Sequence, residues 1–471
     1  MTNTLDRREF LLGTGMLALG SGLLGTGPAR ADTPDFSGRT VRMITQRSVH
    51  QNALSDALRI TAEKWGAKLE VRQVTASELE KKVVLDHVAN SATWDIMYTG
   101  GVQRMYEWYG GKISADMTPL IKQYGDPKLL GLEDLDPNAR KAVTFDDKVL
   151  GLPIATSNQA MCYRKDLFED ASEKAAFKSK YGYDLAPPDT MKQFHDICEF
   201  FTRKKGDTLA GKTLTENFYG TVMPNKKGVY IFHNYENLVV AFGSDIYDPK
   251  TGKSAIRSER GLEAVRFLRS LIPFLPPGHI NMANAESTAT FVSGGAATTL
   301  EYFDRMLGTV SAGDTKVQRD QVGYALPPVA EDNPKGYKHG ARSGPAVMVI
   351  SSLSKDKELA FKLLQSAMGA ETQLEMAKKY PGYMPTRETA LREFAQSTPE
   401  VDYLVRAAAD RDTAMLTDAS IMPYPGILRS NQISEALGDA LQSILGGADI
   451  DPELQRAEGK INAALADVYK S

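Results

Sequence analysis

The segment from Asp147 to Phe168 most limits how this chain can fold, because it reads as two extended runs with a break between them. Apolar residues alternate with small or polar ones in the first run, and Pro153 excludes a helix there. A second apolar run begins at Ala160 and ends before Arg164. Two strands separated by a breaker leave little room for a local hairpin. The segment therefore predicts a chain that passes from one folded body to another, with the backbone of residues 151–157 in the gap.

Strands and helices alternate before this segment. Strands are predicted at 40–45, 69–74 and 94–98, and helices from an Asn52 cap to Gly66 and from a Ser77–Glu80 capping box to about Asn90. Later helices are predicted at 190–204, at 238–243 after His233–Asn237, at 261–271, at 434–446 and at 452–468. Such alternation indicates α/β architecture, in which a mainly parallel sheet is covered by helices on both faces.

Residues 1–31 are predicted to be an export signal. Arg7 and Arg8 precede a glycine-rich, mildly apolar stretch, and Ala29 and Ala31 form a small-x-small cleavage pattern. The apolar run is too short and too rich in glycine for a membrane anchor. The sequence thus predicts a twin-arginine signal cut after Ala31 and a periplasmic mature protein.

The composition is that of an ordinary folded protein, with a net charge of −3 over 471 residues. A weak overall field gives no reason to expect nucleic acid as a partner. Cys162 and Cys198 could form a disulfide in an oxidising compartment, and two buried thiols are the preferred interpretation because Cys198 falls on the apolar face of a predicted helix.

Four segments of the chain carry a family resemblance: DDKVLGLPIATSNQAMCYRKDLFED, TFVSGGAATTLEYFDRM from Thr290, GARSGPAVMVISSLSKDKELAFKLLQSAM from Gly340, and PGYMPTRE from Pro381. They resemble segments of the extracellular solute-binding proteins, family 1, that serve sugar-type ABC importers. Where many relatives carry Gly-Gly-Trp, this chain has residues 342–345, Arg-Ser-Gly-Pro. The resemblance implies a two-lobed periplasmic binding protein fold with hinge crossings. The expected lobes are residues 32–152 with 296–342, and residues 153–295 with 343–471.

The resemblance also implies a function, in which a carbohydrate or polyol is bound between the lobes and delivered to an ABC permease. An acidic sugar is a further possibility because of Arg342, whose alternative role is a salt bridge across the hinge. Two rival hypotheses stay open: an exported enzyme with a bound cofactor, and a binding protein for a non-sugar solute such as a polyamine or peptide. A monomer is expected.

Candidate ligand-binding residues are taken from strand ends and crossings, because ligands of open α/β sheets lie beyond the carboxyl ends of the strands. Aromatic faces can stack on sugar rings, and polar side chains can bind hydroxyl groups. The nine candidates are Gln46, His50, Thr99, Asn158, Tyr235, Glu301, Tyr302, Arg342 and Tyr383.

No catalytic residue, metal site or cofactor is predicted. The six histidines form no H-x-x-H or Cys-His pattern, and no G-x-S-x-G or C-x-x-C motif occurs. After the predicted signal, G-x-G-x-x-G is likewise absent. Glu301 and Asp304 could be pictured as paired glycosidase carboxylates, but acids three residues apart are expected to form a solvated face.

Overall fold

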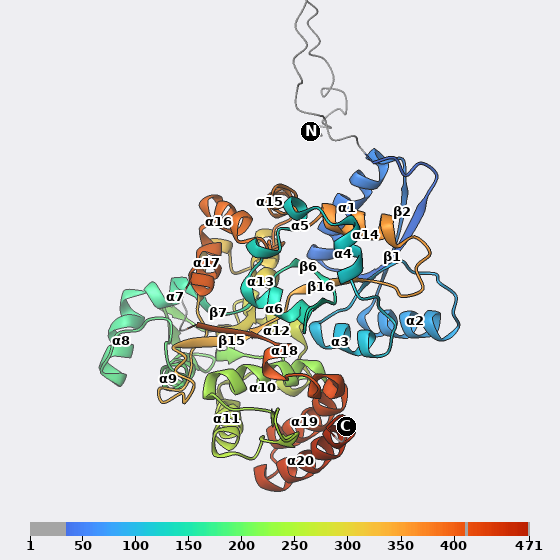
Figure 1. The fold of residues 1–471 in the computed structure, drawn as a ribbon. Coiled ribbons are helices and arrows are strands. Elements are labelled where there is room, and N and C mark those ends of the chain that lie inside the picture. The colour runs from blue at the N-terminus through green and yellow to red at the C-terminus, as the bar shows by residue number, and fades with distance from the viewer. Residues whose placement is uncertain (1–33, 410–412, 470–471) are drawn as a thin grey trace, which may run out of the picture.

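Two separate β-sheets organise the molecule, whose computed structural model describes residues 34–409 and 413–469. The first sheet has the order β2-β1-β3-β16-β6 and the second has the order β10-β13-β7-β14. We call each sheet with the helices that cover it the first lobe and the second lobe (Figure 1). This is the α/β, two-lobed fold predicted from the sequence, with helices on the sheets. The predicted signal, residues 1–31, lies outside the described residues.

The first sheet is mainly parallel. Strand β1 pairs in parallel with β2 and β3, and β16 runs antiparallel between β3 and β6. Most residues of β1, β3, β6 and β16 are buried. This is expected for a sheet that helices cover on both faces. The strands are β1 (Thr40–Gln46), β2 (Lys68–Val74), β3 (Ile96–Tyr98), β6 (Leu152–Ala155) and β16 (Ala346–Ile350).

Helices α1 (Val49–Lys64) and α2 (Ala76–Val88) follow β1 and β2, but both begin differently from the prediction. Ser48, not Asn52, caps α1, because its hydroxyl accepts the amide of Gln51 at 3.2 Å. The capping box of α2 joins Thr75 and Glu78, not Ser77 and Glu80. In both cases a suitable capping oxygen occurs earlier in the chain and starts the helix sooner.

The second sheet contains two strands from residues 296–342, a range that was assigned to the other lobe. Strand β13 (Ala296–Tyr302) pairs with β10 (Tyr219–Val222) and β7 (Gln159–Arg164), and β14 (Val322–Ala325) pairs with β7. Conversely, β16 lies in the first sheet. The assignment of 296–342 to the N-terminal lobe and of all of 343–471 to the C-terminal lobe does not fit these pairings. The physical reason is that every residue of β13 is buried. The residue pattern of a fully buried strand does not indicate which sheet the strand joins.

The chain crosses between the sheets where the sequence predicted. Strand β6 belongs to the first sheet and β7 to the second, so residues 156–158 connect the lobes. Residues 344–345 make another crossing, between β15 (His339–Ser343), which pairs with β17 (Thr413–Thr417), and β16. Asn158 and Ser343 form a β-bridge, which holds these two crossings side by side.

Helix α10 (Val229–Phe242) is longer than predicted and includes residues 233–237, which were expected to precede it. Its buried residues pack against α11 (Glu259–Ser270) and α19 (Ser430–Leu445), and α20 (Ile450–Ala466) packs against α19, at the bottom of Figure 1. Helix α9 (Met191–Phe201) buries Cys198, and Cys162 is buried in β7. Both cysteines are free thiols, as preferred from the sequence, and burial raises the pKa of each.

Other elements complete the two lobes. The longer helices among them are α3 (Val102–Gly110), α8 (Ala171–Tyr181), α12 (Asn284–Val292), α13 (Phe303–Ser311), α14 (Lys357–Ser366), α15 (Ala370–Lys379), α16 (Glu388–Ser397) and α17 (Asp402–Ala409). The shorter helices are α4 (Thr118–Tyr124), α5 (Pro127–Leu130), α6 (Pro137–Val143), α7 (Lys165–Glu169) and α18 (Asp418–Ile421). Short hairpins join β4 (Thr144–Phe145) to β5 (Lys148–Val149), β8 (Thr208–Leu209) to β9 (Lys212–Thr213), and β11 (Tyr247–Asp248) to β12 (Lys253–Ser254).

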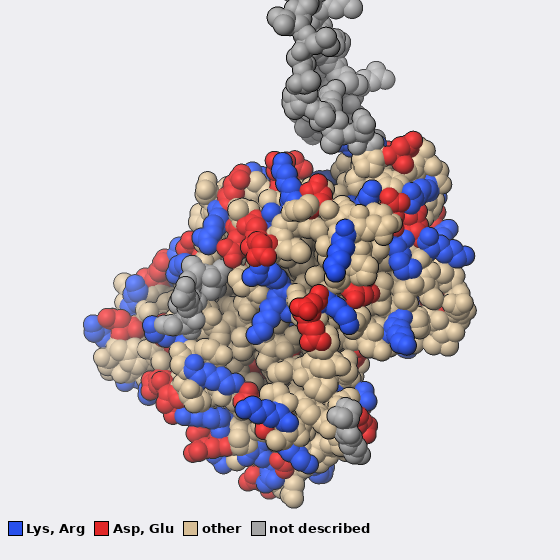
Figure 2. Space-filling view, in the orientation of Figure 1, with Lys and Arg blue, Asp and Glu red and all other residues tan. Residues whose placement is uncertain are grey.

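Two features of the described residues concern possible partners: the hydropathy of the helices and the distribution of surface charge. Within residues 34–409 and 413–469, no helix is both long enough and apolar enough to cross a bilayer. Blue and red residues are interspersed over the face shown in Figure 2. This mixture agrees with the near-neutral composition.

Candidate functional site

A cavity of about 560 Å³ lies between the lobes, in the volume range typical of small-molecule sites. We call it the interlobe cavity. The first lobe contributes the ends of β1 and β3 and the start of α1, and the second lobe contributes the end of β13 and the start of α13. Its lining residues are Gln46, Arg47, Ser48, Val49, His50, Tyr98, Gly100, Gly101, Ser157, His233, Tyr302, Asp304, Arg305, Gly308, Thr309, Arg342, Gly344, Pro345 and Ala346.

A second space of about 200 Å³ shares part of this lining. It is bounded by the first turn of α3, by α10 and by the start of α19. Across it, Glu107 of the first lobe accepts hydrogen bonds from the Ser430 hydroxyl at 3.0 Å and from the Asn431 amide at 3.1 Å. Burial raises the pKa of Glu107. These bonds join the two lobes on one side of the interlobe cavity.

Four of the nine predicted residues line the interlobe cavity: Gln46, His50, Tyr302 and Arg342. Gln46 ends β1, Tyr302 ends β13, and His50 is the second residue of α1. The Nε2 atom of His50 lies 2.9 Å from the Gly382 carbonyl and 3.4 Å from an Asp304 carboxylate oxygen. The rule that ligand groups follow strand ends therefore identified residues from both lobes.

The other five predicted residues are not brought to that cavity's surface. Thr99 and Tyr383 are fully buried, and their hydroxyls donate to the carbonyls of Val347, at 3.2 Å, and Ile154, at 2.5 Å. Tyr235 is fully buried in the core of the second lobe. Asn158 is bonded at the crossing to Ser343 and Thr156.

Glu301, the fifth, is 1% exposed and so does not belong to the solvated face expected for it and Asp304. One of its carboxylate oxygens accepts the Tyr302 amide at 2.8 Å, and the other accepts the Thr288 hydroxyl at 2.9 Å. Burial raises the pKa of Glu301. Its role in this structure is to hold the end of β13 beneath the cavity.

Arg342 forms a buried ion network within the second lobe. Its guanidinium donates two hydrogen bonds to Asp418, at 2.8 and 3.0 Å, and a third to the Tyr302 hydroxyl. Glu236 lies 2.8 Å from the same Nε atom, but the N–H points at Asp418. The salt-bridge alternative considered for Arg342 is thus present, although its partners lie in the same lobe and not across the hinge.

This network places the carboxyl groups of Glu236 and Asp418 beside one cation, and the pKa of each carboxyl group is shifted. Burial raises the pKa of Glu236 well above its ordinary value, and the adjacent Asp418 carboxylate raises it further. Burial also raises the pKa of Asp418, which the Arg342 cation opposes. Because Asp418 receives both guanidinium bonds, we assign the retained proton to Glu236. Nearby, burial lowers the pKa of His233, so this histidine is neutral.

The raised pKa of Glu236 predicts a pH-dependent term in stability. A carboxyl group whose pKa is higher in the folded than in the unfolded protein stabilises the fold at pH values below the unfolded-state pKa. This stabilisation is lost as the pH rises through the folded-state pKa. We expect Glu236→Gln, which keeps the shape of the protonated acid, to gain stability relative to the wild type as pH increases above about 4.5. Urea titrations of both proteins at several pH values measure this difference. A difference that stays constant with pH would show that Glu236 does not retain the proton.

Sequence reasoning missed Tyr98, Asp304 and Arg305. Tyr98 is the last residue of β3 and half-buried, and burial raises its pKa to about 12. Tyr98 and Tyr302 line the cavity from opposite lobes. Asp304 accepts the Ser157 hydroxyl at 2.7 Å, across the crossing. The signal that could have found Asp304 and Arg305 is their position directly after the end of β13.

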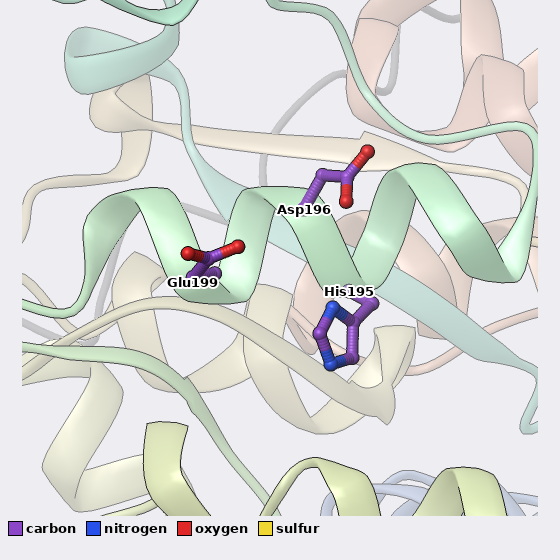
Figure 3. A group of neighbouring side chains, drawn as sticks. All are labelled: His195, Asp196 and Glu199. Atoms are coloured by element: carbon purple, nitrogen blue, oxygen red, sulfur yellow. The ribbon is translucent and has the colours of Figure 1, made fainter. Parts of the chain in front are cut away.

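His195, Asp196 and Glu199 of α9 are close enough to be considered as metal ligands, although no metal site was predicted. Asp196 accepts the Lys192 ammonium at 2.7 Å and the Tyr183 hydroxyl at 3.0 Å. Glu199 is likewise bound by Lys180. In Figure 3 the His195 ring and the Asp196 carboxylate point to different sides of the helix. The two carboxylates are thus already bound by Lys192, Tyr183 and Lys180.

Comparison with known proteins agrees with the fold. The profile of a family described as bacterial extracellular solute-binding protein matches residues 58–402. This match covers most of the chain, and the protein belongs to that family of transport proteins. It is therefore an extracellular or periplasmic solute-binding protein of the ABC transporter type.

Particular relatives share the fold at low identity. A solute-binding protein from Agrobacterium radiobacter K84, solved with ribitol, is 19% identical with a TM-score of 0.73, over 93% of this chain and 99% of that one. One from Agrobacterium vitis S4, solved with D-mannitol, is 20% identical with a TM-score of 0.69, over 91% and 99%. The "Probable amino-acid ABC transporter periplasmic-binding protein y4oP" of Sinorhizobium fredii (strain NBRC 101917 / NGR234) is 20% identical over 93% of each chain.

Proposed function

We propose that this protein binds a carbohydrate or polyol in the interlobe cavity and delivers it to the permease of an ABC importer. The observation that supports this most strongly is the lining of the cavity. Two tyrosines, Tyr98 and Tyr302, line a space that the polar residues Gln46 and Ser48 also line. Aromatic faces suit the C–H surface of a sugar, and polar groups suit its hydroxyls.

Solute-driven closure of the lobes is the proposed mechanism. The cavity is lined by groups from both lobes, so a solute can contact all of them only when the lobes are together. Differential contact with the closed form shifts the population toward it. The permease would then distinguish loaded from empty protein by its shape.

The lobe boundaries that fit this mechanism follow from strand pairing. We assign residues 34–155 and 346–397 to the first lobe, and residues 156–345 and 413–469 to the second. Hinge motion would then occur at residues 156–158, at residues 344–345 and in the connection after α16.

The ligands of the structural relatives, ribitol and D-mannitol, support a polyol or sugar. The name of the Sinorhizobium protein favours the alternative of a non-sugar solute, such as an amino acid, amine or peptide. We propose binding without catalysis, in preference to an exported enzyme with a cofactor, because the cavity's polar groups fit solute binding. Export through the twin-arginine pathway and a monomeric state are further parts of this proposal.

A thermal-shift panel tests the proposed function. It would contain neutral sugars, polyols, sugar acids, amino acids and polyamines, each added in excess to the purified mature protein. A ligand that binds only the native state raises the melting temperature. The proposal expects a shift with at least one sugar, polyol or sugar acid. A shift with amino acids or polyamines alone would support the non-sugar alternative.

A further inference from the structure

Arg305 presents a cation to the interlobe cavity that the protein itself satisfies poorly. It lies in the first turn of α13 and lines the cavity from the second lobe, with 45% of its side chain exposed. Its guanidinium group donates no hydrogen bond to any described residue. Its ion pair within the described chain is a loose contact of 3.5 Å with Glu301.

The acids near Arg305 are engaged elsewhere. Glu301 is bound by the Thr288 hydroxyl and by the Tyr302 amide. One oxygen of Asp304 accepts the Ser157 hydroxyl, and the other lies 3.4 Å from His50. The guanidinium of Arg305 therefore has free donors while the acceptors around it are occupied.

A second cation faces the same cavity from the first lobe. Arg47 directly follows β1, is exposed, and makes no hydrogen bond or ion pair with the described residues. Arg342, in contrast, is bound to Asp418 and Tyr302 and has little capacity left for a solute. The cavity thus holds two cations with free donors, one on each lobe.

We propose that the solute carries an anionic group, a carboxylate or a phosphate, which Arg305 binds and Arg47 contacts from the other lobe. This inference rests on the proposed function and narrows its substrate class to acidic sugars or polyol derivatives. A planar guanidinium matches the two oxygens of such a group, and charge-assisted hydrogen bonds are stronger than neutral ones. An anionic group that lies between Arg305 and Arg47 attracts both cations, so it also favours closure.

Paired probes that differ mainly in charge test this inference by calorimetric titration. The pairs are D-gluconate with D-glucitol, D-galacturonate with D-galactose, and ribitol 5-phosphate with ribitol. We expect at least one acidic member to bind at least about 10-fold more tightly than its neutral partner. A single hydrogen bond to a charged group changes a dissociation constant by about this factor. The first two pairs report on carboxylates and the third on phosphates. Inorganic phosphate alone shows whether the anionic group suffices.

Variants then assign the charge recognition to Arg305. We expect Arg305→Gln to weaken binding of the acidic probe about 10- to 100-fold while changing the neutral partner by about threefold or less. Arg305→Lys keeps the charge and should retain part of the affinity. Arg47→Gln should have a smaller effect of the same kind. The matched control is Arg406→Gln, an exposed arginine of α17 that pairs with Asp402 and lies outside the cavity lining. Thermal unfolding without solute checks that each variant is folded.

The outcomes separate the two proposals. If neutral probes bind as tightly as their acidic partners, or if Arg305→Gln weakens both equally, the anion inference is overturned and the proposed function stands. If neither neutral nor acidic probes bind, the proposed function fails and the inference fails with it. A tenfold rise in ionic strength provides a second readout, because screening should weaken the acidic probe selectively.

Discussion

Arg342→Ala is expected to lower the free energy of unfolding by about 3–5 kcal/mol, because it leaves the carboxyl groups of Asp418 and Glu236 buried without their cation. Arg342 is 4% exposed, and both acids are fully buried. Three hydrogen bonds from its guanidinium are lost at once, including the one to Tyr302 at the cavity. Chemical unfolding of the solute-free protein measures the change.

Two further variants show whether the buried charges cause the loss. Arg406→Ala removes an exposed arginine of α17 whose partner Asp402 is also exposed, and should cost about 1 kcal/mol or less. Adding Asp418→Asn to Arg342→Ala removes one uncompensated charge and should restore part of the stability. A loss for Arg342→Ala no larger than that for Arg406→Ala would contradict the buried network.

Tyr98→Ala is expected to weaken solute binding about 10- to 100-fold, because burying a large side chain against a ligand contributes about 1.5–3 kcal/mol. Tyr98 is the last residue of β3 and lines the cavity, so the substitution removes the aromatic side chain of the first lobe from the cavity lining. Tyr98→Phe keeps the ring and should bind within about fivefold of the wild type. Calorimetric titration with the tightest solute from the thermal-shift panel measures both.

The matched control for Tyr98 is Tyr337→Ala. Tyr337 is also partly buried against the core but is not among the residues that line the cavity. It should lower stability while leaving affinity unchanged. Equal losses of affinity for the two alanine variants would mean that Tyr98 acts through general destabilisation and not through contact with solute.

The chain's crossing between two sheets could be predicted from the sequence because it depends on local signals. Pro153 and the two apolar runs around it are sufficient to predict β6 and β7 as separate strands. The sheet that each later strand joins could not be predicted. Strand β13 is buried along its whole length, so its apolar pattern fits either sheet equally well. Helix starts shifted for a similar reason, since Ser48 and Thr75 were equally good caps close to those predicted.

The site was predictable where it follows strand ends and unpredictable where it depends on contacts between distant segments. Gln46 and Tyr302 end their strands and line the cavity. The partner of Arg342 lies 76 residues further along the chain, and no local pattern links them. Tyr235 and Tyr383 were chosen as aromatic residues at strand ends and crossings, but the packing of α10 and of the segment after α15 buries both. Arg305 was missed because its availability depends on what its neighbours already bind.

A crystal structure of the mature protein with the tightest solute from the panel tests the central claim most directly. The account predicts solute density between the two lobes, in contact with Tyr98 and Tyr302 and within hydrogen-bonding distance of Gln46 or Arg305. Density bound outside the interlobe cavity, or a cavity that stays empty while the solute is bound at saturating concentration, would contradict it.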